Sequence, residues 1–240
     1  ADNIADTDAT VTAKLKAAGG VFMGKLATHE FAIGGPSFDL PWPPARNPWN
    51  TDRHPGGSSS GSGAAVAAGL LPGALGSDTG GSVRHPASIC SLAGIKPTYG
   101  RVSRAGVVPL SFSLDNVGPL TRTVEDNAIM LSIISGHDPR DPASARAEAE
   151  DFTRDIDKGV KGMRIGLVRH FYTKDHNSQK EMADSVDHAA DVLRDLGATV
   201  EEVELAPLSQ YAAVNRVILL SEAYAVHELS LIHISEPTRQ

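Results

Sequence analysis

This chain of 240 residues contains little cysteine, has no excess of basic over acidic residues and lacks long apolar runs. The single cysteine, Cys90, excludes an intrachain disulfide framework. The sequence holds no apolar run long enough to cross a membrane. Because the net charge is -7 and no stretch concentrates Lys and Arg, we do not expect nucleic acid to bind on a basic face. No secretory signal is visible, and together these features favour a cytoplasmic protein.

The composition that remains is that of an ordinary globular protein, with 41% hydrophobic and 21% charged residues. A strand–helix–strand pattern over residues 163–205 is typical of a parallel or mixed sheet with helices on its faces. We therefore predict an α/β fold with a mixed, largely parallel sheet core covered by helices on both faces. Further strands are expected at 21–23 and 74–77, and helices at 62–71, 82–88, 124–134 and 208–228. Asp8 is the expected cap of a first helix in which Val11, Leu15 and Ala18 share one face, and Thr123 is the expected cap of the helix at 124–134. The polar residues 137–161 are expected to form a surface excursion.

Two turns rich in glycine and serine, at 56–63 and 76–82, flank a short run of small apolar residues. In the second turn, Gly80 and Gly81 precede Ser82, so the backbone can turn sharply and leave N–H groups facing a ligand. A hydroxyl beside such N–H groups supplies a nucleophile and an oxyanion site. These are the minimum requirements for acyl transfer.

The first turn by itself has three interpretations. A flexible linker is disfavoured because an apolar helix follows at once. A phosphate loop is disfavoured because the Gly-Lys-Ser/Thr ending is missing. Residues 57–61 do fit the G-x-S-x-G elbow around Ser59, but 51–55 is a poor strand and the elbow needs a strand before it.

Taken together, the turns carry a resemblance. GGSSSGSGAAVAAG, GSDTGGSVRHPA and GIKPTYGRVSRAGVVPLSFSLDNVGPLTRTVED are similar to the motifs of the amidase signature family. The resemblance runs from about residue 5 to 228, and we expect residues 1–228 to be part of one amidase signature domain. Residues 229–240 resemble the translation of a sequencing-library adapter, so we expect this tail not to be native.

The resemblance implies a Ser–Ser–Lys triad with Ser82 as nucleophile and Ser58 as the bridging serine, held by a cis peptide bond. It also implies that the N–H groups of Thr79, Gly80, Gly81 and Ser82 form the oxyanion hole. Asp78, Arg84 and Ser59 are the expected supporting residues, with Asp78 and Arg84 hydrogen-bonding the two turns together. No metal or organic cofactor is implied.

The triad lysine is where the chain departs from the family pattern. In the family, a neutral buried lysine accepts the proton of the bridging serine, and burial favours the neutral form. In the family that lysine lies N-terminal to the segment that residues 5–32 resemble, so we expect it upstream of Ala1. Lys25 matches a different family position and suits a structural lysine at a strand end. These 240 residues alone should then show little turnover.

The resemblance implies hydrolysis of a small-molecule amide through an acyl-enzyme. It leaves two alternatives: the A subunit of a glutamine-dependent tRNA amidotransferase, and a catalytically inactive fragment. It also leaves open a homodimer.

Overall fold

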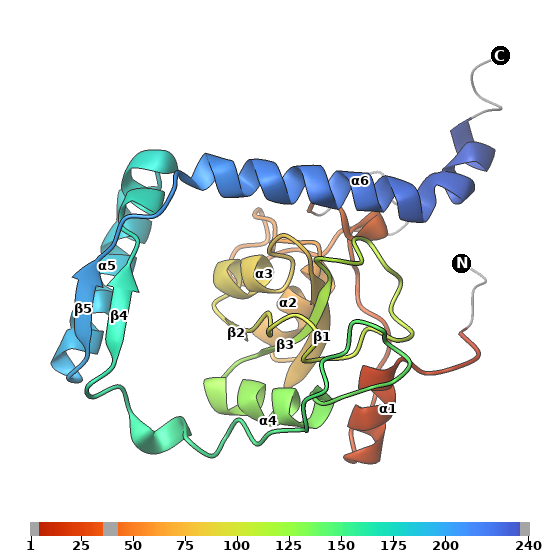
Figure 1. Ribbon diagram of the computed structural model, residues 1–240, viewed down its shortest axis with the longest axis horizontal. Helices are drawn as coiled ribbons and strands as arrows, with labels where there is room; N and C mark the ends of the chain where they lie inside the picture. The colour runs from red at the N-terminus through yellow and green to blue at the C-terminus, as the bar shows by residue number, and fades with distance from the viewer. Residues whose placement is uncertain (1–4, 36–42, 236–240) are drawn as a thin grey trace. The chain divides into compact units, whose positions relative to one another are not determined.

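In this computed structural model, residues 5–35 and 43–235 are described, with the backbone alone for 229–235. The chain divides into two compact units, residues 1–154 together with 219–240, and residues 155–218. The first unit contains α1 (Thr10–Ala17), α2 (Ser60–Ala67), β1 (Gly73–Asp78), α3 (Arg84–Ile89), β2 (Ala93–Gly94), β3 (Asn116–Thr121) and α4 (Val124–Ile134), with a short 3₁₀ turn at Glu30–Ala32 (Figure 1).

The sheet of the first unit has the strand order β1-β3-β2, and both pairings are antiparallel. Gly73 lies opposite Thr121 and Asp78 opposite Asn116, so the pairing spans β1 and β3 completely. All six residues of the central strand β3 are buried. The end of β1 that leads into the second Gly/Ser turn is therefore fixed against a rigid strand.

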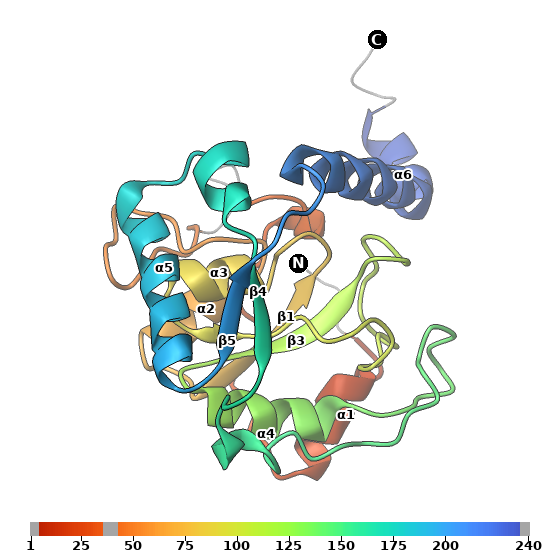
Figure 2. The same cartoon turned by 60° about the vertical axis from the view of Figure 1, so that its left-hand side comes forward.

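Helices cover both faces of this sheet. Successive side chains of a strand point to opposite faces, so Val117 and Leu120 of β3 enter different cores. One core joins Val117 to Val11 of α1, Val102, and Leu131 and Ile134 of α4. The other joins Leu120 to Val83 and Ala87 at α3. The prediction of helices on both faces holds for this sheet, which lies between α4 and the α2–α3 pair (Figure 2).

The prediction of a largely parallel core is wrong for the described residues. Only β4 (Arg164–Leu167) and β5 (Thr199–Glu202) are parallel, joined by α5 (Lys180–Asp195) in the second unit. The strand–helix–strand pattern thus identified this local pair but did not extend to the first unit. There the sequence pattern missed β3, because Gly118 and Pro119 disfavour a strand. The chain is a mixed α/β protein, with its larger sheet antiparallel.

Two smaller expectations near the N-terminus are also wrong. Residues 21–23 belong to no strand, and Val21 and Met23 are 84% and 76% exposed, so the expected buried strand is not there. Asp8 does not cap α1; the N-cap is Ala9, and Asp8 forms an ion pair with Lys16 instead. Thr123 does cap α4, since its hydroxyl accepts the Asp126 N–H at 3.1 Å.

The N-terminal helix also covers the end of a distant helix. Lys14 Nζ donates to the carbonyl oxygens of Ser135 at 2.5 Å and Ile134 at 3.4 Å, where α4 ends. These carbonyls have no partner within their own helix. Burial lowers the pKa of Lys14, although the charge of Asp138 acts in the opposite direction. The two helices are thus joined by polar contacts as well as by their shared core.

The segment after α4 was expected to be a polar surface excursion, yet it begins with two buried carboxylates. Asp138 accepts hydrogen bonds from the hydroxyls of Thr10 and Ser103. Asp141 accepts from the Arg104 backbone N–H at 2.8 Å and forms an ion pair with the Arg104 side chain. Sequence polarity misplaced these residues because their charge is satisfied by groups far away in the chain.

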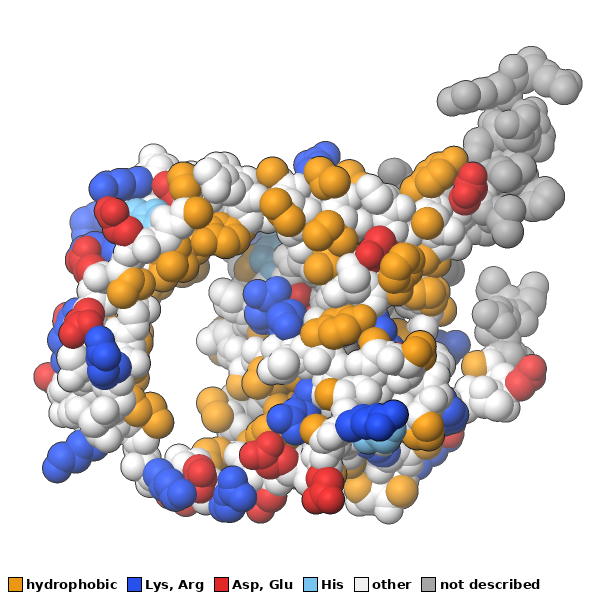
Figure 3. Space-filling view, in the orientation of Figure 1, with side chains coloured by type: hydrophobic (Ala, Val, Ile, Leu, Met, Phe, Trp, Pro, Cys, Tyr) orange, Lys and Arg blue, Asp and Glu red, His pale blue; other side chains and the backbone are white. Residues whose placement is uncertain are grey.

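The last helix, α6 (Leu208–Ser235), extends into the tail that we expect not to be native. Figure 3 shows hydrophobic side chains along this helix, and Val214, Val217, Leu220 and Tyr224 are exposed on it. Residues 236–240 lie outside the described part of the chain. The non-native origin of residues 229–240 stays a prediction. The assignment of residues 1–228 to one domain also stays a prediction. No helix in the described ranges combines the length and hydropathy needed to cross a bilayer.

Candidate active site

The two Gly/Ser turns lie against each other. The first turn leads into α2 and the second joins β1 to α3. The Ser59 backbone N–H donates to the Ser82 carbonyl oxygen at 3.3 Å. The Gly57 N–H donates to His85 Nδ1, also at 3.3 Å. At Gly56, where φ is +81°, a Cβ would lie 2.7 Å from Pro86 Cα, so only glycine allows this approach.

Ser58 is fully enclosed within the first turn. Its residue exposure is 0%, and the Gly57–Ser58 peptide bond is cis, as the sequence resemblance implied. Its carbonyl oxygen accepts the His29 N–H at 3.0 Å. Its hydroxyl is buried and has no hydrogen-bond partner among the described residues. Since a buried hydroxyl without a partner is costly, this oxygen is the clearest functional signal in the site.

Ser82 is half-buried, at the point where the second turn enters α3. Gly81 has φ +129°, which favours glycine there. Of the expected oxyanion donors, the Gly81 N–H is engaged, because it donates to Asp78 Oδ1 at 2.8 Å. The N–H groups of Gly80 and Ser82 donate no hydrogen bond to any described residue. These two donors beside the Ser82 hydroxyl are the part of the turn that can receive a developing negative charge.

Asp78 organises the second turn from inside. Its fully buried carboxylate accepts from the backbone N–H groups of Gly81, Val83 and Arg84 at 2.8, 3.1 and 3.2 Å. It also accepts from Arg84 Nε at 3.0 Å and Nη2 at 2.9 Å. Burial alone would raise the pKa of Asp78, but the hydrogen bonds and charge of Arg84, with the backbone donors, hold this pKa below its usual value. The same pairing raises the pKa of Arg84.

The sequence suggested that Asp78 and Arg84 tie the two turns together, and this expectation is wrong. Their hydrogen bonds instead close the second turn on itself. The tie is made by Ser59 and His85. Ser59 Oγ donates to the Ser77 carbonyl at 3.4 Å, in addition to its backbone bond to Ser82. The elbow interpretation of Ser59 gains no support, because no strand precedes it within 51–55.

Lysines of the described chain do not reach the Ser58 hydroxyl, which has no described partner. Lys25 is exposed and does not follow a strand. Lys14 is engaged at the end of α4. No cluster of His, Cys, Asp or Glu suited to a metal ion occurs among the described residues.

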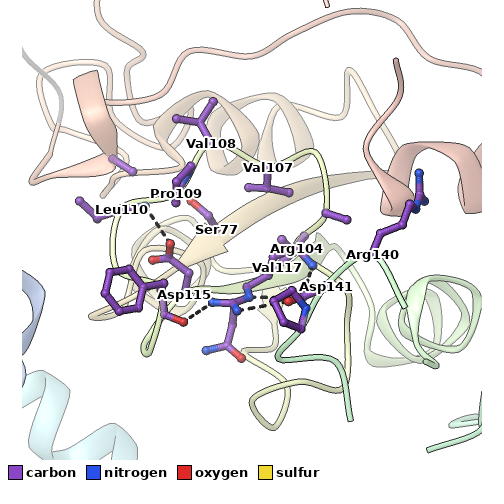
Figure 4. A pocket seen from close by; sticks show the side chains of 15 residues that line it. Ser77, Arg104, Val107, Val108, Pro109, Leu110, Asp115, Val117, Arg140 and Asp141 are labelled. Carbon is purple, nitrogen blue, oxygen red and sulfur yellow. Dashed lines mark hydrogen bonds and ion pairs between the residues drawn. The ribbon is translucent and has the colours of Figure 1, made fainter. Parts of the chain in front are cut away.

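A pocket of about 190 Å³ lies beside this site and is shown in Figure 4. It is lined by Ser77 of β1, by Asp115 and Val117 at β3, and by the apolar run Val107–Leu110. Neither Ser58 nor Ser82 lines it. Sequence reasoning missed Asp115, whose side chain accepts the Thr79 hydroxyl at 2.6 Å, because no local pattern marks a contact between residues so far apart.

Two hydrogen-bonded, serine-bearing turns on a mixed α/β frame are the feature by which the sequence resembles the amidase signature family. The family model described as Amidase matches residues 1–238, and the chain belongs to this family. It is 50% identical over 216 residues to the A subunit of glutamyl-tRNA(Gln) amidotransferase from Halothermothrix orenii, covering 90% of this chain and 45% of that protein. The chain thus spans about half the length of the curated relatives it matches.

Solved structures agree with this assignment. The A subunit of glutamyl-tRNA(Gln) amidotransferase from Thermotoga maritima superposes with a TM-score of 0.86 at 44% identity, covering 91% of this chain and 48% of that one. The peptide amidase of Stenotrophomonas maltophilia gives a TM-score of 0.78 at 37% identity, covering 91% and 46%.

Proposed function

We propose that the protein hydrolyses a carboxamide through an acyl-enzyme formed on Ser82. The observation that carries this proposal is the Ser58 hydroxyl, buried and unpartnered within the described residues, in a turn that is hydrogen-bonded to Ser82. A hydroxyl in that position can accept the nucleophile's proton only if a basic group reaches it in turn. Following the resemblance, we propose a neutral lysine from a segment upstream of Ala1 as that group.

In the proposed reaction, Ser82 Oγ attacks the amide carbonyl carbon and its proton passes to Ser58. The oxyanion is stabilised by the N–H groups of Gly80 and Ser82. The C–N bond breaks as the leaving amine takes a proton from Ser58, and the acyl group stays on Ser82. Water then attacks the acyl carbon, which releases the carboxylic acid and returns the proton to Ser82. Asp78 and Arg84 keep the second turn closed, and Ser59 ties it to the first.

A second candidate function is the A subunit of a glutamine-dependent tRNA amidotransferase. The 50% identity to the corresponding protein from Halothermothrix orenii favours it. The same chemistry would then release ammonia from glutamine for transfer to an aminoacyl-tRNA within a complex. Co-purification of partner subunits with the protein from its native host supports this candidate, whereas a free, active amidase contradicts it. A homodimer and a cytoplasmic location are further proposals.

The test compares this chain with a longer form that includes the proposed upstream segment. We expect the longer form to hydrolyse simple amides and to be labelled at Ser82 by a fluorophosphonate. The 240 residues alone should react far more slowly. Equal turnover in both forms would contradict the proposed upstream base. Labelling that survives Ser82→Ala would contradict the assigned nucleophile.

A further inference from the structure

Asp115 is a buried carboxylate that the proposed reaction does not use. It lies directly before β3, whose first residue, Asn116, pairs with Asp78. Asp115 is 8% exposed, and so is Thr79, which follows Asp78 in the second turn. The Thr79 hydroxyl donates to Asp115 Oδ1 at 2.6 Å, the short distance expected when the acceptor is charged. Thr79 thus follows one buried carboxylate, Asp78, in the chain and is hydrogen-bonded to another, Asp115.

The other oxygen of Asp115 holds a loop. Oδ2 accepts the backbone N–H groups of Leu110 at 2.8 Å and Ser111 at 3.0 Å. All three partners of this side chain are therefore donors, and a carboxylate accepts on both oxygens. An asparagine would turn an NH₂ group toward one set of donors, and that set would lose its acceptor.

The loop itself has independent anchors. Glu222 accepts the Ser113 hydroxyl at 2.6 Å and the Ser113 N–H at 3.0 Å, and it also accepts the Ser111 hydroxyl. The Phe112 carbonyl accepts Tyr99 OH at 2.6 Å and Arg104 Nη1 at 2.5 Å. Groups other than Asp115 therefore also hold the loop in place. The Thr79 hydroxyl, by contrast, is bound by the carboxylate of Asp115.

We infer that Asp115 is a positioning residue: it fixes Thr79, and through Thr79 the orientation of the Gly80 and Ser82 N–H groups. This role in the reaction rests on the proposed function. The geometric part does not, because it concerns the order of the turn whether or not the turn is catalytic. Preorganised donors are effective only while they are held at the position where charge develops, so loosening Thr79 should slow acylation and leave ligand binding nearly unchanged.

The first part of the test uses the longer form of the protein and measures the rate at which a fluorophosphonate labels it. Varying the fluorophosphonate concentration gives the maximal labelling rate and the concentration at which labelling reaches half of that rate. Asp115→Asn and Thr79→Val should each lower the maximal rate by about 10-fold or more, with the half-saturating concentration within about 2-fold. Thr79→Ser keeps the hydroxyl and should restore most of the rate. The double variant should lose little beyond either single one, because both remove the same contact.

Asp138→Asn is the matched control. Asp138 is also buried and also accepts hydroxyl and backbone N–H donors: the hydroxyls of Thr10 and Ser103 and the N–H of Arg140. It forms an ion pair with the Arg140 side chain as well, and it does not touch the turn. It should reduce stability without changing the labelling rate per folded molecule. An equal rate loss in Asp138→Asn, or a wild-type rate in folded Asp115→Asn, would overturn the inference.

The second arm measures hydrogen exchange in the 240-residue chain and requires no catalysis. The N–H groups of Gly81 and Val83 are bonded to Asp78 and should exchange slowly. Asp115→Asn and Thr79→Val should accelerate both, while Thr79→Ser and Asp138→Asn should not. Unchanged exchange in Asp115→Asn contradicts the positioning role directly. Accelerated exchange without any labelling of the active form at Ser82 would instead show that the proposed function, and not the positioning, is wrong.

Discussion

The backbone N–H of Ser59 donates to the carbonyl oxygen of Ser82 at 3.3 Å, and this bond joins two turns that are separated in the sequence by α2 and β1. It places the residue after Ser58 against the proposed nucleophile. Because it is made by main-chain atoms, it survives substitution of either serine side chain. Variants at Ser58 and Ser82 can therefore remove hydroxyls without removing this connection between the turns.

Replacing Ser58 by alanine should leave the stability of the 240-residue chain unchanged or raise it slightly. The hydroxyl is buried without a described partner, so its removal ends a desolvation cost and breaks no bond. Urea unfolding at pH 7 measures the effect. Ser62→Ala is the control, since the buried Ser62 hydroxyl donates to the Leu75 carbonyl at 2.8 Å. It should cost about 1 kcal/mol. Equal losses in both variants would disprove the unpartnered state of Ser58.

Replacing Arg84 by glutamine should destabilise the first unit in a pH-dependent way. The pKa of folded Asp78 lies below its unfolded value near 4, so its stabilising contribution is complete above that value and is lost as the pH falls through the folded pKa. We expect a deficit of about 1–3 kcal/mol at pH 7, at the lower end because Arg84 is half-exposed. The deficit should shrink below pH 4.

Unfolding curves of the wild type and Arg84→Gln between pH 3 and 7 provide the measurement. Lys16→Gln is the matched control, because Lys16 pairs with Asp8 at the surface. It should change stability by no more than about 1 kcal/mol. A deficit for Arg84→Gln that stays constant with pH would mean that Asp78 is not the linked group.

Gly118→Ala should disrupt the central strand. A Cβ at Gly118 would overlap the Ile95 carbonyl oxygen, which is backbone and cannot move without separating β2 from β3. We expect a loss of at least about 3 kcal/mol, or failure to fold. Gly35→Ala serves for comparison, since a Cβ there meets no described residue within 4 Å. Similar melting temperatures for the two variants would contradict this packing.

Much of the candidate site follows from the sequence because its chemistry is local. The run from Asp78 to Arg84 places a carboxylate, two glycines, a serine and a guanidinium within one turn, and the structure closes this turn with bonds between those same residues. Helix α4 was equally predictable, since Thr123 is a cap that acts only three residues ahead.

The remainder depends on contacts that no local pattern carries. With Gly118 and Pro119 at its centre, the sequence of β3 is typical of a turn. It forms a strand because β1 and β2 pair with it on either side. Asp115 resembles any polar loop residue until β3 places it beside Thr79. The antiparallel direction of the sheet has the same origin, since it is set by pairing across long connections and not by the sequence of either strand.

The contact from Lys14 to the end of α4 bears on how this protein can be shortened or tagged. Removing the chain up to Gly19 would do more than shorten a terminus. It would leave the last carbonyls of α4 to solvent, take Val11 out of a core it shares with Val102 and Ile134, and deprive Asp138 of the Thr10 hydroxyl. Fusion partners and affinity tags therefore belong upstream of Asp8, where the first helix stays intact.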